Sequence, residues 1–367
     1  MDSNKVKISS RQLGILLVVT IIGVGILTLP RDVSEVGGTD GWILIIIAGI
    51  LSILESLIIH GLSMRFPNQT IIEYSRELVG SSVSILIGII IALYYLVFSA
   101  FGVRIFGEVV KTFLLWRTPI EMIMVTLLLV VAYLVRNDLE GIVRFYELAI
   151  IIMFVPYFLA LFTGITDLDF TNLLPIFQTP FKTLFQGSFQ IIFSYIGIET
   201  IFLLIPFVSD QKNIKKTLLI SISSVIFIYL ISIVFVVATF GVDTIKDLIW
   251  PLMGYMKSIE IPGGFIEQLE GVIMATWVFI SYTTLSTTYF LSAFTLSRVT
   301  KTKEHSFFVT ALLPVIYVLA VLPGNVAQLY HWLGIFSMYA GTLVIIVIPL
   351  FLLLVAKARK KGVKTNG

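Results

Sequence analysis

Three carboxylates lie inside long apolar runs of this sequence, and they are the side chains best placed to do chemistry. They are Glu55, Glu147 and Glu199. A charged group in the middle of a membrane is costly, so each carboxylate is a candidate functional residue. Glu199 is the strongest candidate because it closes a glycine-interrupted motif. Its carboxylate can accept hydrogen bonds from free backbone N–H groups, or it can take up a proton.

The other two carboxylates have simpler alternatives. Glu147 follows Arg144 by three residues. That spacing places both side chains on one helix face and predicts an ion pair near the membrane surface. Glu55 has no evident partner, so its alternative to a functional role is burial in the protonated form against another helix.

Two apolar segments are interrupted by glycine at matching places in the two halves of the chain. The first contains Gly23, Val24, Gly25 and Ile26, and the second contains Phe193, Ser194, Tyr195, Ile196, Gly197, Ile198 and Glu199. Hydrocarbon cannot satisfy free backbone groups, so a broken membrane helix needs protein or a cavity around the break. Breaks at corresponding positions indicate a binding site at the bilayer midplane. For either segment alone, close helix packing is the alternative.

A broken helix leaves N–H groups free on one half and carbonyl groups free on the other. The first kind of end suits a carboxylate, and the second suits an ammonium group. A site that offers both suits a zwitterion, so we expect an amino acid as the ligand. A methyl group at Gly25 should disturb this site, because the backbone there must approach the ligand and can require a positive φ.

A hydroxyl-rich segment supplies further candidates. Ser281, Thr284 and Thr288 fall at i, i+3 and i+7, on one stripe of a helix. They predict either a polar lining or cation site beside the first break, or hydrogen bonds that join helices. Tyr94 and Tyr95 are candidates to line the same pocket, with packing as the alternative.

Membrane helices must position these residues. Hydrophobic residues make up 57% of the chain and charged residues 13%, and the mean hydropathy is +1.01. We therefore predict an all-α integral membrane protein with ten transmembrane helices, forming one domain over residues 1–367. Breaks in the first and sixth spans favour a LeuT-like 5+5 inverted repeat, with one repeat at about 11–163 and the other at about 184–356. The spans are expected near residues 11–30, 42–62, 82–103, 119–135, 141–163, 184–206, 217–240, 269–296, 306–323 and 330–356. The third span can extend toward Lys111.

The distribution of basic residues predicts the orientation. Lysine and arginine favour cytoplasmic loops. With the N-terminus inside, 18 of the 25 basic residues fall in cytoplasmic loops and 7 fall outside. Both termini are therefore expected in the cytoplasm, and Asp243–Glu270 is expected outside. This outer segment, with a net charge of −3 and Trp250, predicts a lid over the site, a partner surface, or a tryptophan of the headgroup belt.

Composition also argues against several classes of protein. The chain has no cysteine, and its three histidines lie far apart in the sequence. We therefore expect no metal cluster and no thiol chemistry. There is no phosphate loop, dinucleotide fingerprint or basic–aromatic array, so we expect no cofactor, no nucleic acid and no enzyme activity. The polar Met1–Arg11 segment lacks a cleavage site, which predicts no cleaved signal peptide.

The two glycine motifs resemble those of the first and sixth helices of the amino acid–polyamine–organocation permease superfamily. More narrowly, the chain resembles the B subunit of the GerA-type spore germinant receptors of Bacillus and its relatives. The segments that carry this resemblance are Thr28-Leu29-Pro30-Arg31, Asp40-Gly41-Trp42-Ile43, Phe113-Leu114-Leu115-Trp116-Arg117-Thr118-Pro119-Ile120, Leu248-Ile249-Trp250-Pro251 and Phe265-Ile266-Glu267.

The resemblance implies a subunit of the inner spore membrane that binds a small nutrient, often an amino acid. It also implies two partners, an A subunit and a lipoprotein C subunit. Some proton-coupled permeases of the superfamily use a lysine in the fifth helix, but no lysine occurs between Leu139 and Phe162. That departure favours sensing of a nutrient over pumping. The alternative is a secondary amino acid transporter of the cell membrane.

Overall fold

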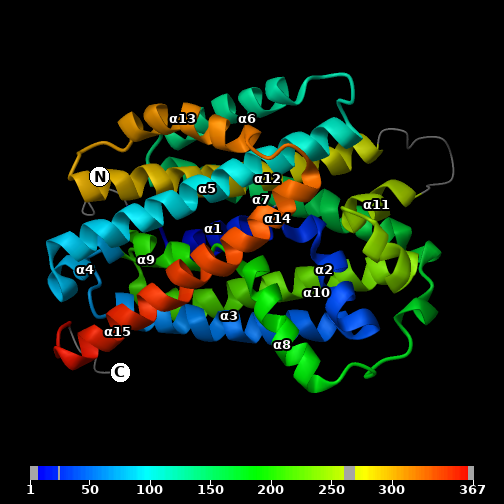
Figure 1. Cartoon of the computed structure of the whole chain (residues 1–367), viewed down its shortest axis with the longest axis horizontal. Helices are drawn as coiled ribbons and strands as arrows, with labels where there is room; N and C mark the ends of the chain where they lie inside the picture. Colours follow the sequence, from blue (N-terminus) through cyan, green and yellow to red (C-terminus); the bar gives the residue numbers. More distant parts are fainter. Residues whose placement is uncertain (1–6, 24, 260–268, 363–367) are drawn as a thin grey trace.

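The computed structural model describes residues 7–23, 25–259 and 269–362, and the described chain is essentially helical (Figure 1). Most of the long helices lie side by side along a common direction. In chain order the helices are α1 (Ser10–Ile22), α2 (Leu29–Gly37), α3 (Gly41–Ser63), α4 (Ile71–Val79), α5 (Ser81–Phe113), α6 (Ile120–Val135), α7 (Leu139–Thr163), α8 (Phe181–Ile191), α9 (Ile201–Leu204), α10 (Ile214–Asp247), α11 (Pro251–Ser258), α12 (Leu269–Thr300), α13 (Ser306–Val321), α14 (Val326–Phe336) and α15 (Ile348–Ala358). A π-helical segment, Ser337–Val347, joins α14 to α15.

Several helices meet the length and hydropathy needed to cross a membrane, as expected for a multi-pass membrane protein. Within the described residues there are five such helical stretches, and a sixth if the bent pair 181–195 and 198–207 counts as one span. The two parts of that pair meet at an angle of 53°. Three shorter apolar helices, α1, α6 and α13, accompany them. The prediction of an all-helical membrane protein is confirmed at this level.

Helix ends follow local capping chemistry. Ser9 and Gln12 form a capping box at the start of α1, and Thr70 and Glu73 form another at the start of α4. The third predicted span does extend beyond residue 103, since α5 ends at Phe113. The polar stretch between the first two predicted spans, residues 31–40, is itself helical, in α2 and in a 3₁₀ turn, Gly38–Asp40. Pro30 lies in the first turn of α2, where a missing N–H costs nothing.

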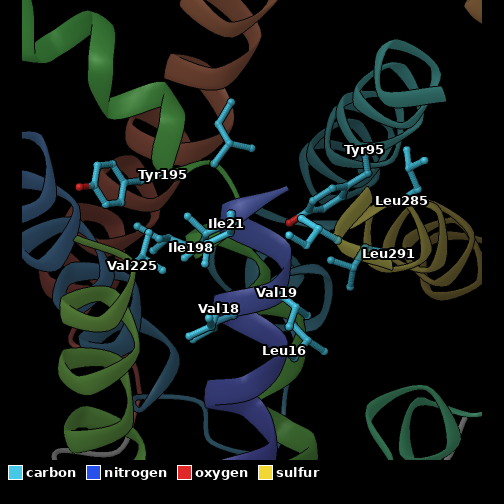
Figure 2. Close-up of a cluster of buried hydrophobic side chains, with 14 of the residues drawn as sticks. Leu16, Val18, Val19, Ile21, Tyr95, Tyr195, Ile198, Val225, Leu285 and Leu291 are labelled. Carbon is cyan, nitrogen blue, oxygen red and sulfur yellow. The ribbon is translucent and has the colours of Figure 1, made fainter. Parts of the chain in front are cut away.

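The first helix runs through the interior of the bundle, next to α7, α10 and α12. All but three of its residues are buried. Figure 2 shows the apolar side chains around it, with Tyr195 on one side of α1 and Tyr95 on the other. This burial explains why α1 has little amphipathic character, because a helix surrounded by protein has no polar face.

One end of the bundle is held together by contacts near both ends of the described chain. Ile8 donates its N–H to Phe207 O at 2.9 Å, and Arg65 donates to Lys361 O at 3.3 Å. Asp210 accepts hydrogen bonds from the N–H and hydroxyl of Ser10, at 2.6 and 2.5 Å. Partial burial opposes ionisation of Asp210, but these bonds and one from Asn213 outweigh it, so the pKa of Asp210 lies below its usual range. This end therefore ties the start of α1 to the segment after α9.

Candidate functional site

The first break follows α1 directly. Gly23 has a φ of +26°, and a short 3₁₀ turn, Gly25–Leu27, separates it from α2. A Cβ atom on Gly23 would lie 2.8 Å from the hydroxyl oxygen of Thr284, so this position is closed to a side chain. Val24, also predicted to be in the site, lies outside the described residues. Ile26 is buried beside the break.

Gly25 behaves differently from the expectation. It lies in the 3₁₀ turn and does not have a positive φ. A Cβ atom there would meet nothing within 4 Å. The conformational need for glycine therefore falls on Gly23 and not on Gly25. A methyl group at Gly25 would therefore meet open space.

Two side chains from other helices satisfy the carbonyls at the end of α1. The hydroxyl of Thr284 donates to Val19 O at 2.9 Å. The hydroxyl of Tyr229, on α10, lies 3.0 Å from Ile21 O. Helix ends leave such carbonyls without intrahelical partners, and in a membrane interior protein donors must replace water.

The second break separates α8 from α9. A 3₁₀ turn, Ile192–Tyr195, ends in an extended Ile196, and Gly197 follows with a φ of +123°. Only glycine adopts that conformation without strain. A second 3₁₀ turn, Ile198–Thr200, then leads into α9. The predicted interruption is therefore present at the predicted residues.

Glu199 bridges this second break to an unbroken helix. Its Oε2 accepts the Gly197 N–H at 2.7 Å, and its Oε1 accepts the hydroxyl of Tyr94, on α5, at 3.1 Å. The side chain is fully buried. The predicted role of Glu199 as an acceptor for a free backbone N–H is confirmed, and Tyr94 is brought to the same place.

The two breaks touch each other. A Cβ atom on Gly197 would lie 3.1 Å from a side-chain carbon of Ile21 and 3.3 Å from the Ile21 nitrogen. The hydroxyl of Tyr229, already close to Ile21 O, also lies 2.9 Å from Ser194 O. One tyrosine thus spans both breaks. Sequence reasoning missed Tyr229, because nothing near it in the chain distinguishes it from a packing residue.

Aromatic rings enclose the second break. Tyr94 stacks on Phe336 with ring centroids 5.5 Å apart. Phe193 lies against Gly341 of the π-helical segment, where a Cβ atom would be 3.1 Å from its ring. Tyr195 points away toward α3 and donates to Ile45 O at 3.0 Å. Tyr94 and Phe193 therefore adjoin the break, whereas Tyr195 supports it from the outer side.

The hydroxyl stripe of α12 divides into two roles. Thr284 contacts the first break, as described above. Thr288 instead accepts a hydrogen bond from Ser99, on α5, at 2.8 Å, which matches the alternative of helix-to-helix bonding. The buried hydroxyl of Ser281 makes no hydrogen bond to any described residue.

Glu147 does not pair with Arg144, so that prediction is wrong. Arg144 contacts Glu140 at 2.6 Å, and Glu147 accepts a hydrogen bond from Gln12 at 3.1 Å. The i, i+4 spacing of Glu140 and Arg144 suits an ion pair on the helix surface. Glu55 has one carboxylate oxygen buried without a partner in the described chain.

The described part of the outer segment packs over the first break. Leu252, Met253 and Met256 of α11 line a cavity together with Ile26 and Leu27. Its volume of about 20 Å³ has room for roughly one water molecule. Residues 260–268 of this segment, including Phe265, Ile266 and Glu267, lie outside the described residues.

Trp250 is not a residue of the headgroup belt. It is 6% exposed, and its indole N–H donates to the hydroxyl of Tyr330, on α14, at 2.7 Å. Its ring also lies 5.8 Å from that of Phe113. Trp250 thus fastens the start of α11 to two other helices. Sequence reasoning did not identify Tyr330, which is eighty residues away in the chain.

The arrangement offers hydrogen-bonding backbone and apolar walls, and no cluster of metal ligands. Among the residues that the structure describes, no group of three or more histidine, aspartate or glutamate side chains is placed to hold a metal ion. What the described residues offer chemically is hydrogen bonding by backbone groups at helix ends, inside apolar walls.

Comparison with known proteins gives similarity over nearly the whole chain. Residues 7–329, which include both breaks, match the family described as "Spore germination protein". Spore germination protein YndE of Bacillus subtilis (strain 168) is 31% identical over 99% of this chain and 100% of its own length. Spore germination protein B2 of the same organism is 27% identical over 98% of each chain. Spore germination protein GerLB of Bacillus cereus is 25% identical over 97% of this chain and 96% of its own.

Proposed function

Because the chain belongs to the spore germination protein family, with B-subunit-type germinant receptor homologues over nearly its full length, we propose that it is the nutrient-sensing, permease-like subunit of a germinant receptor. In this proposal a small nutrient, an amino acid, binds where the two breaks meet. Binding then acts on two partners, an A subunit and a lipoprotein C subunit, to start germination. The protein resides in the inner spore membrane.

The contact of Gly197 with Ile21 carries the proposal. It brings the end of α1 and the second break to one place inside the bundle. A 3₁₀ turn starts at Gly25. The N–H groups at the start of a helix lack intrahelical acceptors, which suits a carboxylate. The carbonyl ends of α1 and of the turn before Gly197 suit an ammonium group. Tyr94 and Phe193 supply apolar walls for the side chain of the ligand.

The proposed topology has ten spans and an inverted repeat, with both termini in the cytoplasm. Segments predicted to be cytoplasmic contact one another at one end of the bundle: Gln211 donates to Pro67 O at 2.9 Å, and Arg298 pairs with Glu73 at 2.9 Å. Segments predicted to be outside meet at the other end, where Thr179 donates its N–H to Asp40 at 2.8 Å. Ile8 and Lys361 lie at the first of these ends, through their bonds to Phe207 and Arg65. An even number of crossings accounts for both chain ends lying at the same end of the bundle. The breaks then fall in the first and sixth spans.

The experiment separates sensing from transport. Spores that lack the gene are complemented with the wild-type gene or with a Glu199→Leu variant, and each is exposed to single amino acids. Germination is scored in spores, and uptake of the same amino acid is scored in vegetative cells. We expect one nutrient response to be lost in the deletion and in the variant, with uptake unchanged. Loss of uptake without loss of germination would overturn the proposal and favour a secondary transporter.

A further inference from the structure

A groove lies between α1, α7 and α10 at the end of the bundle where α1 and α10 begin. Its volume is about 450 Å³, and it is separate from the residues of the two breaks. Basic and polar residues line its mouth, and its depth is lined mainly by apolar residues, together with Ser221 and Ser224. This division of polarity is the feature that requires an explanation.

The mouth of the groove carries hydrogen-bond donors and positive charge. Arg11, Asn213, Lys216 and Thr217 line it, and both charged residues of the lining are basic. The side chains of Arg11 and Lys216 are exposed. Asp210, which Asn213 contacts at 3.1 Å, also accepts the two hydrogen bonds from Ser10, so its carboxylate is already engaged. The mouth is therefore suited to an anionic group with several oxygen atoms.

The depth of the groove is mainly apolar, and its apolar surface continues along α7. Ile15, Val18 and Ile220 line it, and Ile150 is shared with a second hollow on the α7 face. That hollow extends to Phe162. The twelve helical rises from Ile150 to Phe162 span about 18 Å, which exceeds the roughly 15 Å depth of one hydrocarbon leaflet. A single acyl chain fits this length.

We propose that the groove binds an anionic phospholipid, with its phosphate at Arg11 and Lys216 and an acyl chain along α7. Basic pockets between membrane helices bind anionic headgroups in this way. A soluble anion would use the mouth but leave the apolar depth unfilled, and a neutral lipid would leave the two cations without a counterion. Both cations lie in the first turns of apolar helices, α1 and α10, which is the expected level of the headgroups. The proposal does not depend on nutrient binding at the breaks.

The test uses the purified full chain in a neutral detergent. Dissociation constants for phosphatidylglycerol and for phosphatidylcholine with the same acyl chains are measured by native mass spectrometry. We expect the wild type to prefer phosphatidylglycerol. Each of Arg11→Gln and Lys216→Gln should weaken that lipid about fivefold, and the double variant about 25-fold, which corresponds to about 1 kcal/mol per cation. Lys215→Gln, an exposed neighbour outside the groove lining, is the matched control and should leave binding unchanged.

A second variant tests the apolar depth. Ile220 is 56% exposed and lines the groove, so Ile220→Trp should fill the groove without disturbing the fold. We expect it to weaken phosphatidylglycerol at least fivefold, while the melting temperature without lipid stays within about 2 °C of wild type. Equal affinity for both lipids, or equal loss in the Lys215→Gln control, would overturn the proposal. Unchanged binding in Ile220→Trp would overturn the placement of the acyl chain.

Discussion

The hydroxyl of Tyr94 lies 3.1 Å from Oε1 of Glu199 and donates a hydrogen bond to it. Because the other oxygen of Glu199 holds the Gly197 N–H, this contact connects the unbroken helix α5 to the second break. A ligand that changes the geometry of the break therefore acts on α5 as well. α5 in turn packs along α12, whose Thr284 holds the end of α1.

Replacing Glu199 separates two roles for its carboxylate. Glu199→Gln keeps one acceptor oxygen for the Gly197 N–H and should retain part of the nutrient response. Glu199→Leu leaves that N–H unpaired at a cost of about 2 kcal/mol and should lose nearly all of the response. The measurement is a nutrient dose–response curve of spores, with an immunoblot of the protein. Equal failure of both variants would instead indicate a proton carrier, and wild-type curves for both would exclude either role.

The two glycines of the first break form a matched pair. Gly23→Ala imposes a positive φ on alanine and brings its methyl group to 2.8 Å from Thr284, so we expect a loss of stability of about 2 kcal/mol. Gly25→Ala has open space, so the protein should keep its melting temperature. If the ligand approaches the backbone at Gly25, the added methyl group should raise the nutrient concentration for half-maximal response about tenfold or more.

Both variants are measured by thermal unfolding of the purified protein and by spore dose–response curves. A normal melting temperature for Gly23→Ala would contradict the structural role of Gly23. A wild-type curve for Gly25→Ala would contradict the placement of the nutrient at the first break.

The local features of this site were predictable from the sequence, and the long-range ones were not. The hydrogen bond from the Gly197 N–H to Glu199 joins residues only two positions apart, so the short sequence motif contains both the donor and the acceptor. The predicted partner of Glu147, Arg144, was wrong because helix spacing considers only residues of the same helix. The carboxylate of Glu147 instead accepts a hydrogen bond from Gln12 on another helix. The burial of Trp250 likewise depends on Tyr330, far along the chain.

The need for glycine was assigned to the wrong residue for a related reason. Sequence shows that Gly23 and Gly25 interrupt an apolar run, but not which of them has a positive φ. The contact that closes Gly23 to a side chain comes from Thr284 on α12, far along the chain. The helical state of residues 31–40 is not evident from their polar composition, although Pro30 lies in the first turn of α2.

The hydroxyl of Tyr229 should contribute more to the free energy of unfolding than other tyrosine hydroxyls, because it lies close to both breaks. Tyr229→Phe removes the donor close to both Ile21 O and Ser194 O, so we expect a loss of about 2 kcal/mol. Thermal unfolding of the purified protein measures it. Tyr282→Phe is the control, because that hydroxyl donates to Val130 O between unbroken helices at 3.2 Å. An equal effect of the two variants would contradict a special role for Tyr229.

The bond from Trp250 to Tyr330 should set how readily α11 leaves the first break. Trp250→Ala and Tyr330→Phe both remove it, so each should shift the nutrient dose–response curve without changing the amount of protein. The double variant should add little to Trp250→Ala, because the two changes remove one interaction. Loss of partner subunits from the membrane would indicate an assembly surface instead. Unchanged curves with normal subunit levels would contradict the lid.

Asp210 should make the stability of the end of the bundle where α1 begins depend on pH. Its pKa is lower in the folded protein than the ordinary value of 3.8, so its contribution is complete above that value and disappears as the pH falls through the folded value. Asp210→Asn weakens the bonds from Ser10, and we expect a loss of about 1 kcal/mol at pH 7. The gap between wild type and variant should therefore close below about pH 4. The carboxylate of Asp169 bonds within its own turn to Thr171 and to no other described residue. Asp169→Asn should leave the nutrient dose–response curve unchanged, whereas Asp210→Asn should shift it by freeing the start of α1. A gap in melting temperature that stays constant from pH 7 to pH 3 would show that the charge of Asp210 does not hold α1 in place.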